Sequence, residues 1–459
     1  SFLIHLKIHP MKTTIRIIIA LFLVGSFSSC EKISKTTSFT ANVPMYMSYE
    51  NLRSAVSNDN SKTLEKPGKI FLYNSLILIN DFEKGIHIYD NGNPSAPSHI
   101  AFIQIPGNID IAVRDNILYA DSYTDLVAID ISNPTNAREV GRTSNALSYT
   151  IPSGMDWNYP VAEIDESKGV VVGYTIGEVE ETCKNQDCRV YYDMNEEWNG
   201  SWGGQMMSDE GSPVSFSGNT NSVRSSSSSN NSAIAGSMAR FMMIENYLYV
   251  ITDQNTVEVF DIRTNNLQSV ASFKPWEDAS GWGVIETLFS FKNHLFIGSN
   301  SGMLAYNVIN PSSPVYLSSY SHMTSCDPVV ANDQYAFVTL RAGNNCNWGN
   351  TNQLDILDIT DIMSPTELSS FEMSNPHGLG IDSENEILFV CDGFDGLKVY
   401  SFKDINQVSS SQLDHYSGIE TYDVIINNGI AHVIGTDGLK QFGYNNQGKL
   451  SELSTISLN

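Results

Sequence analysis

The chain has 459 residues, of which 41% are hydrophobic and 10% aromatic, so it can bury a large core and global disorder is not expected. Its 51 acidic residues outnumber the 26 basic ones and give a net charge of -25. Phosphate backbones and anionic lipid head groups repel so acidic a protein, which argues against nucleic acid as a partner.

The N-terminus carries the pattern of an export signal that ends at a cysteine. Met11 is followed by the basic residues Lys12 and Arg16, by the apolar run 17–24, and by "GSFSSC", which ends at Cys30. The apolar run is shorter than the roughly 20 residues of a membrane-spanning helix, so we expect cleavage. "FSSC" resembles the lipobox of bacterial lipoproteins, which implies that Cys30 is acylated and that its acyl chains hold the mature protein on a membrane.

This signal suggests a division of the chain into three parts. We expect residues 1–29 to be removed, with the stretch before Met11 as upstream sequence. Residues 30–66, rich in Ser, Thr and Asn, are expected to form a lipidated N-terminus and a tether. The folded domain is expected at 67–459, with an insertion at about 184–237. An ordinary signal peptide with a chance cysteine is the alternative to lipidation.

The location implied by a lipobox is the bacterial cell envelope. We expect an outer-membrane lipoprotein that faces either the periplasm or the cell surface. Glu31, next to the acylated cysteine, weakly resembles the acidic signals that send lipoproteins of the Bacteroidota outward. The partners expected there are the membrane, through the N-terminal lipid, and an unknown protein or glycan.

Five more cysteines follow Cys30, and export permits them to form disulfides. Cys183 and Cys188 could close a small loop, and Cys326 and Cys346 form a second possible pair. Cys391 lies in the apolar run "ILFVC" and is expected to be a buried, small hydrophobic residue. The spacing of these cysteines is not that of a zinc site, so we assign no metal to them.

From Lys69 onward the pattern is all-β: short β-branched and aromatic runs are separated by turn residues every 8 to 12 positions. A recurrent apolar strand ends each time in a polar turn. The residues that end it are Asp90, Asp130, Asp261, Asn307, Asp358, Ser401 and Gly443. Five of the six intervals between them are 40 to 51 residues long, the size of one four-stranded propeller blade.

The remaining interval, between Asp130 and Asp261, is 131 residues long and must contain something extra. Residues 159–174 match the first hairpin of a later unit, 376–391, and predict a degenerate blade. Residues 215–237 are a Ser/Asn-rich tract too polar for a core. We therefore favour a single β-propeller of eight four-stranded antiparallel blades, with seven as the alternative and a disordered insertion in the third blade.

The repeated turn has a physical reason. Each unit is a small sheet that is apolar on both faces, so it can hide its hydrophobic surface only against its neighbours. Each unit then needs the same turn into its outer strand. An Asp accepts hydrogen bonds from nearby backbone N–H groups there, and a Pro fixes φ.

The segment "DLVAIDISNPTNAREVG" (125–141) resembles the repeat of the LVIVD family, and the resemblance extends over roughly residues 69–444. The blocks 43–56 and 105–134 resemble lipoproteins of this kind from the Bacteroidota. The resemblance implies a β-propeller on the envelope and brings no established reaction. The two last units lack the Asn-Pro turn, so their outer strands could differ.

Polar residues recur near the start of the first strand of the units, where they could converge at one mouth of the axial channel. They are Asp110, Glu286, Asp327, His377 and Asp423. Four carboxylates and an imidazole could hold a hard cation such as calcium or a cationic ligand. Alternatively, each Asp caps backbone N–H groups of the adjoining loop. Apart from calcium there, we expect no cofactor, and no catalytic set is assigned.

The resulting functional hypothesis is an envelope-anchored, non-enzymatic recognition scaffold for protein or carbohydrate. One alternative is a glycan-acting hydrolase or lyase that uses the acids at the channel mouth. A second is a structural envelope protein. Fold alone does not separate the three.

Overall fold

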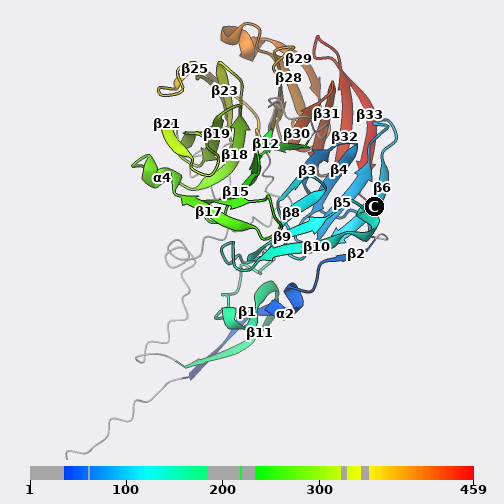
Figure 1. The fold of residues 1–459 in the computed structure, drawn as a ribbon, viewed down its shortest axis with the longest axis vertical. Coiled ribbons are helices and arrows are strands. Elements are labelled where there is room, and N and C mark those ends of the chain that lie inside the picture. The colour runs from blue at the N-terminus through cyan, green and yellow to red at the C-terminus, as the bar shows by residue number, and fades with distance from the viewer. Residues whose placement is uncertain are drawn as a thin grey trace, which may run out of the picture. The chain divides into compact units, whose positions relative to one another are not determined.

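The computed structural model describes residues 36–59, 62–152, 154–182, 218–219, 233–321, 328–342 and 351–458. The chain divides into two compact units. The larger unit contains seven four-stranded antiparallel blades arranged in a ring (Figure 1). Each blade is built from four consecutive strands that pair in chain order, so every blade is a meander.

The innermost strands are β3 (Pro67–Tyr73), β7 (Ile111–Arg114), β14 (Phe241–Ile244), β18 (Ile285–Phe291), β22 (Val329–Ala331), β26 (Leu379–Asp382) and β30 (Thr421–Asn427). The second strands are β4 (Leu76–Asp81), β8 (Ile117–Ser122), β15 (Tyr247–Ile251), β19 (His294–Ser299), β23 (Tyr335–Leu340), β27 (Ile387–Cys391) and β31 (Ile430–Gly435). The third strands are β5 (Gly85–Asp90), β9 (Asp125–Asp130), β16 (Val257–Asp261), β20 (Gly302–Asn307), β24 (Gln353–Asp358), β28 (Leu397–Ser401) and β32 (Gly438–Tyr444). The outermost strands are β6 (Ser98–Gln104), β10 (Arg138–Thr143), β17 (Gln268–Phe273), β21 (Val315–Ser321), β25 (Thr366–Glu372), β29 (Gln412–Tyr416) and β33 (Leu450–Ser457).

The core of the propeller lies between adjacent blades. The inner three strands of each blade are buried along most of their length, whereas the outermost strands alternate with exposed residues. One hydrophobic cluster runs from Phe71 of the first blade to Val308 of the fourth, so neighbouring sheets share their cores. Each fully buried Leu, Ile or Phe contributes about 1.5–3 kcal/mol, and the stacking that the sequence predicts is what buries them.

The predicted turn chemistry is confirmed in six blades. In each, the residue that ends the third strand accepts a hydrogen bond from the backbone N–H two residues later, as Asp130 does from Ser132 at 2.8 Å. The other five acceptors are Asp90, Asp261, Asn307, Asp358 and Ser401. Gly443 has no side chain to make this bond, so the seventh blade turns without it.

The preference for eight blades is wrong, because the seven turn markers correspond to seven blades. Residues 159–174, which were expected to begin an extra blade, lead instead into β11 (Val170–Thr182), and β11 pairs with β1 (Thr36–Met47) as a separate two-stranded sheet. The segment predicted as a tether therefore contains a strand, followed by the short helix α2 (Tyr49–Leu52).

The smaller unit comprises, among the described residues, 36–43, 156–162 and 176–182. The buried amide of Asn42 organises it. Asn42 donates to the carbonyls of Asp156 and Tyr159 at 2.9 and 2.7 Å, and it accepts from the N–H of Asp156 at 2.8 Å. One side chain thus satisfies three backbone groups of a loop that has no regular secondary structure.

The insertion ends inside the axial channel. Its last residues form β13 (Ala233–Ser237), which pairs antiparallel with the innermost strand β3 and also contacts β7, β18, β26 and β30. In Figure 1 the adjoining strand β12 (Gly218–Asn219) is drawn in the middle of the ring. The sequence assigned residues 233–237 to a disordered insertion in the third blade, but they precede that blade and fill the channel. The other insertion residues lie outside the described part of the chain.

Several short elements complete the described structure. They are β2 (Ser57–Asn58), α4 (Pro275–Asp278) and the 3-10 helices Pro134–Asn136, Glu166–Lys168 and Ile405–Ser410. The helices among the described residues have at most six residues each, so none of them reaches across a bilayer.

The ring closes where the last blade meets the first, the red and blue sheets of Figure 1. The side chains of Gln441 and Asn91 exchange two hydrogen bonds of 2.8 and 2.9 Å across this seam. Gln441 also donates to the carbonyl of Pro94, which accepts from Ser454 as well. These bonds join residues about 350 positions apart and set the register of closure.

We predict that Gln441→Ala lowers the free energy of unfolding by about 1–3 kcal/mol, because its partners at the seam lose hydrogen bonds in a partly buried place. Urea unfolding at neutral pH measures this loss. Gln412→Ala, an exposed glutamine on the outermost strand β29, is the control and should change stability by less than about 0.5 kcal/mol. Equal effects of the two substitutions would contradict a closing role for Gln441.

Candidate functional site

Four of the five predicted channel-mouth residues are described, and all four are buried at or just before the start of an innermost strand. Asp110, Glu286, His377 and Asp423 are 1–3% exposed. Asp327, the fifth, lies outside the described residues. The aligned positions therefore do lie at corresponding places in the blades, as the pattern predicts, but the side chains fall into two groups that each contain a cation.

The first group surrounds Lys69, at the start of β3. Its ammonium pairs with the carboxylate of Asp110 and donates to the carbonyl of Met238 at 3.4 Å. Asp423 lies within electrostatic reach of Lys69 and accepts from the N–H and hydroxyl of Ser237 at 3.3 and 3.1 Å. A calcium ion at this place would compete with the ammonium. The same bonds fasten the end of the channel strand β13 to the first and last blades.

Burial controls the protonation of this group. Desolvation lowers the pKa of Lys69 to about 8, although the attraction of Asp110 opposes that shift. Desolvation also raises the pKa of Asp423 to about 7, against its hydrogen bonds to Ser237 and the nearby charge of Lys69. The attraction between the ammonium of Lys69 and its acidic partners therefore offsets only part of the free energy that it costs to remove these charges from water.

The second group surrounds Arg341, just after β23. Its guanidinium lies 3.0 Å from Nδ1 of His377, and the negative charge of Glu286 is within electrostatic reach. Desolvation and then the charge of Arg341 hold the pKa of His377 well below its ordinary value, so the imidazole is neutral. Desolvation lowers the pKa of Arg341 to about 10, which leaves it protonated at neutral pH.

Sequence reasoning missed the cations. Lys69 and Arg240 stand at the same position of their inner strands as Asp110 does, and an alignment that considered every charged type would have found both. Arg341 follows a second strand instead, so the strand alignment contains no signal for it. Within the described residues, no cluster of three or more His, Cys, Asp or Glu side chains is arranged to hold a metal ion.

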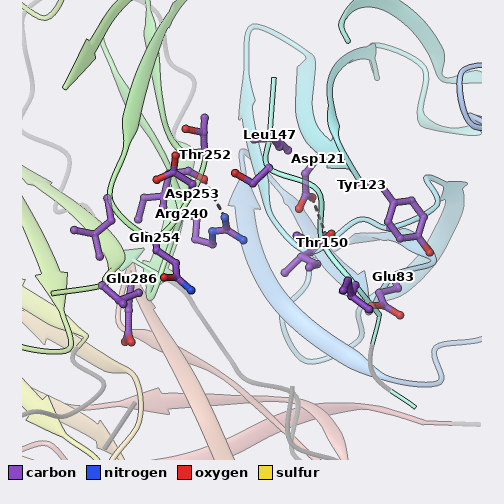
Figure 2. Close-up of a pocket in the computed structure, with 17 residues that line it drawn as sticks. Glu83, Asp121, Tyr123, Leu147, Thr150, Arg240, Thr252, Asp253, Gln254 and Glu286 are labelled. Carbon is purple, nitrogen blue, oxygen red and sulfur yellow. Dashed lines mark hydrogen bonds between the residues drawn. The ribbon is translucent and has the colours of Figure 1, made fainter. Parts of the chain in front are cut away.

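A pocket beside the channel mouth is lined mainly by the second and third blades, with Glu83 from the first blade and residues 284–286 from the fourth, and encloses about 800 Å³ including the part open to solvent. It is built from the connections that enter and turn within these blades, so no single segment forms it (Figure 2). Its hydrogen-bonding lining consists of Glu83, Asp121, Tyr123, Ser148, Thr150, Arg240, Thr252, Asp253, Gln254 and Glu286. Apolar side chains such as Leu147, Ile151 and Ile285 fill the spaces between them.

Arg240 is the one cation among the residues that line this pocket, against four carboxylates. One end of its guanidinium donates to the carbonyl of Ile251 at 3.0 Å (Figure 2). Asp121 accepts from the N–H groups of Ile109 and Asp110 at 2.8 and 2.9 Å, and burial still raises its pKa to about 6. Desolvation likewise raises the pKa of Glu83. The pocket is therefore acidic but partly shielded from water.

Two of the lining residues have an unusual backbone. Glu83 and Tyr123 occupy left-handed conformations, with φ of 60° and 53°, at the turns of the first and second blades. The ring of Tyr123 packs against Gly107, where an added Cβ would lie 2.4 Å from the ring. Non-glycine residues hold such conformations only when the surroundings impose them, and such residues concentrate at binding sites.

A large exposed aromatic side chain lies on the loop that leads into the pocket-lining residues Val284, Ile285 and Glu286. Trp282 is 74% exposed, two residues before the lining residue Val284. Gly281 and Gly283, on either side of it, pack against the buried Trp276. A Cβ at either glycine would collide with the ring of Trp276. The loop is therefore fixed from below by one tryptophan while the other faces solvent.

The cysteine predictions fall mostly outside the described residues. Cys30, Cys183, Cys188, Cys326 and Cys346 all lie there, so lipidation and both disulfide pairs stay predictions. Cys391 is fully buried and, within the described part of the chain, forms no disulfide; its burial confirms the prediction of a small core residue. Burial holds the pKa of its thiol well above the ordinary value, so it is unreactive.

This architecture defines a seven-bladed β-propeller protein. In sequence, the LVIVD repeat family matches residues 108–144, which are the second blade and the loop before it. The match confirms the repeat resemblance for that blade. A search of curated protein sequences finds no match to the chain.

Several solved structures have a similar chain path. A protein from Lactobacillus plantarum is 12% identical, with 85% of this chain and 96% of that chain covered and a TM-score of 0.51. The periplasmic gluconolactonase PpgL of Pseudomonas aeruginosa is 10% identical over 85% and 96% of the two chains, with a TM-score of 0.49. BamB from Moraxella catarrhalis is 12% identical over 86% and 89%, with a TM-score of 0.42. At such identities the likeness concerns the fold alone.

Proposed function

We propose that this chain is an envelope lipoprotein, acylated at Cys30, whose propeller binds carbohydrate without transforming it. The pocket beside the channel mouth is the ligand site. The single observation that carries the proposal is the lining of converging hydrogen-bonding side chains. The exposed Trp282, two residues before the lining residue Val284 in the chain, adds an aromatic ring on the same loop. Ligand sites are concave and present a few placed polar groups on an apolar background.

The chemistry of the lining favours a neutral sugar over an anion. Sugar hydroxyls donate to carboxylates and to amide oxygens, and Asp253, Glu286 and Gln254 supply such acceptors. The C–H face of a sugar ring stacks on an aromatic face, which Trp282 offers. Four carboxylates against one guanidinium would repel phosphate or sulfate groups.

The charged groups at the channel mouth support a structural role beside this site. Lys69 neutralises Asp110, and Arg341 faces both His377 and Glu286, so these predicted acids already have protein partners. Catalysis by a pair of acids needs one protonated and one ionised carboxyl on either side of the scissile bond. Binding by the adjacent pocket requires no such arrangement.

We predict that Trp282→Ala weakens glycan binding about fivefold without lowering the melting temperature, because the ring is exposed and stacking is worth about 1 kcal/mol. A glycan panel screened by thermal shift on the signal-free protein identifies the ligand, and calorimetry then compares the variants. Gln254→Ala should weaken binding in the same way, since this side chain is exposed at the pocket.

Phe394→Ala is the matched control. Phe394 is 75% exposed, as Trp282 is, but it stands on the turn of the sixth blade, away from the pocket. It should leave the affinity unchanged. Equal loss in both variants would overturn the assignment of the pocket, and cleaved glycan in the mixture would overturn the non-enzymatic part of the proposal.

A further inference from the structure

A row of polar side chains crosses the first blade, apart from the pocket and from the channel. Asp81 ends β4, His87 lies in β5 and His99 lies in β6. Nδ1 of His87 is 3.1 Å from Nε2 of His99, and Nε2 of His87 is 3.7 Å from Oδ2 of Asp81. Three adjacent strands thus place a carboxylate, an imidazole and a second imidazole in line.

A β-bulge brings the second histidine into this row. In the pairing of β5 with β6, Ile88 opposes Ala101 but Tyr89 opposes His99, so Ile100 is the extra residue. The bulge turns His99 to the face of the blade that His87 occupies, next to the ring of Tyr89, whose centroid is 5.1 Å away. Bulges re-aim single side chains in this way and recur beside functional sites.

The buried end of the row has unsatisfied polar atoms. Asp81 and His87 are fully buried, and Oδ2 of Asp81 and Nε2 of His87 make no hydrogen bond. The other oxygen of Asp81 already accepts from the N–H of Lys66. Because the carboxylate faces Nε2, it favours the tautomer with the proton there, which leaves the lone pair of Nδ1 directed at His99.

The distance between Nδ1 of His87 and Nε2 of His99 is that of two nitrogens that bind the same metal ion. Imidazole nitrogens bind zinc and similar ions at about 2.0–2.1 Å, so two nitrogens on one ion stand roughly 2.9–3.4 Å apart for angles between square and tetrahedral. The observed 3.1 Å falls in this interval. A carboxylate behind the first histidine is the usual orienting partner of such a ligand.

We propose that His87 and His99 bind a divalent transition-metal ion of the Zn²⁺, Ni²⁺ or Cu²⁺ class, with Asp81 as the positioning residue and water in the remaining coordination positions. His99 is exposed, so an ion can enter from its side. Imidazole suits this class of ion, whereas calcium and magnesium prefer oxygen ligands. The net charge of -25 raises the local concentration of any cation.

The groups around His99 favour its neutral form. Burial, followed by the proximity of His87, lowers the pKa of His99, and a hydrogen bond to the backbone of Ala101 partly opposes this. The lowered pKa keeps the ring of His99 available as a ligand at neutral pH. Phe102 packs 4.6 Å from the ring of His87, and the ammonium of Lys62 lies over the Phe102 ring, 4.9 Å from its centroid.

The test is calorimetric titration of the chelator-treated, signal-free protein with Zn²⁺ and, separately, Ni²⁺. One equivalent should bind, and His99→Gln should weaken that binding at least tenfold. His415→Gln is the matched control, because His415 is a partly exposed histidine paired with Asp395 in another blade. It should leave the affinity unchanged.

A second measurement covers the case in which a variant is unstable. Imidazole ¹⁵N resonances of the wild-type protein report both histidines directly, and one equivalent of Zn²⁺ should shift the Nδ1 signal of His87 and the Nε2 signal of His99. Lys62→Met should tighten binding, because it removes a nearby positive charge. Absent binding would overturn the proposal and leave the contact between the rings as a hydrogen bond alone. Binding that persists in His99→Gln with these resonances unmoved would overturn it as well, because the ion would then bind elsewhere.

Discussion

Replacing Lys69 with methionine is expected to lower the free energy of unfolding by about 3–5 kcal/mol, because it leaves the carboxylate of Asp110 buried without its cation. Both side chains are less than 5% exposed, so water cannot replace the lost ammonium. The lost bond to Met238 would also loosen the channel strand from the first blade. Urea unfolding at pH 7, where the native Lys69 is protonated, measures the change.

Two further variants separate this effect from lost packing. Lys84→Met breaks the exposed pair with Glu65 and should cost less than about 1 kcal/mol. The double variant Lys69→Met, Asp110→Asn also removes the buried carboxylate that has lost its cation, so it should recover part of the lost stability. Replacing both partners of a buried ion pair costs much less than removing only one of them. If Lys69→Met alone lowered the free energy of unfolding no more than Lys84→Met does, a stabilising role for the buried pair would be contradicted.

The ring of blades could be predicted from the sequence because local chemistry repeats in it. Asp90, Asp130, Asp261 and Asp358 each accept a backbone N–H two residues on, and this bond depends only on neighbours in the chain. The eighth blade was predicted from the likeness of two hairpins. The same sequence pattern also fits a strand that belongs to no blade, and β11 is such a strand, because it pairs with β1 in a sheet of their own. A two-residue periodicity identifies strands but not their partners.

The candidate site was predictable in position and not in electrostatics. Asp110 and Asp423 mark the starts of inner strands, so an alignment of blades finds them. The same alignment contains Lys69 but does not show that it pairs with Asp110 of the next blade. Ser237, the partner of Asp423, lies in the channel strand, outside the repeat of the blades. The pocket could not be predicted from the sequence for the same reason. It is assembled from the turns of separate blades, with lining residues from Glu83 to Glu286.

Asp423→Asn is expected to stabilise the protein increasingly as the pH rises. Burial raises the pKa of this carboxyl to about 7, whereas in the unfolded chain it has its ordinary pKa of 3.8. The folded state therefore binds the proton more tightly, and wild-type stability falls between these two values by about 1.4 kcal/mol per pH unit. Asparagine has no proton to lose, so the stability of the variant relative to that of the wild type should grow by about 2–3 kcal/mol between pH 5 and 7.5.

Unfolding curves of both proteins across this range test the sign as well as the size, and the limit of about 7.5 keeps Lys69 protonated. Asp130→Asn is the control. A hydrogen bond from Ser132 lowers the pKa of Asp130, so this carboxyl is ionised in both states over the whole range and its gap to wild type should stay constant. If the Asp423→Asn gap were equally constant, Asp423 would already be ionised in the folded protein at pH 5. The attraction of Lys69 would then outweigh desolvation, and the charges that fasten the channel strand would form a fully ionic cluster.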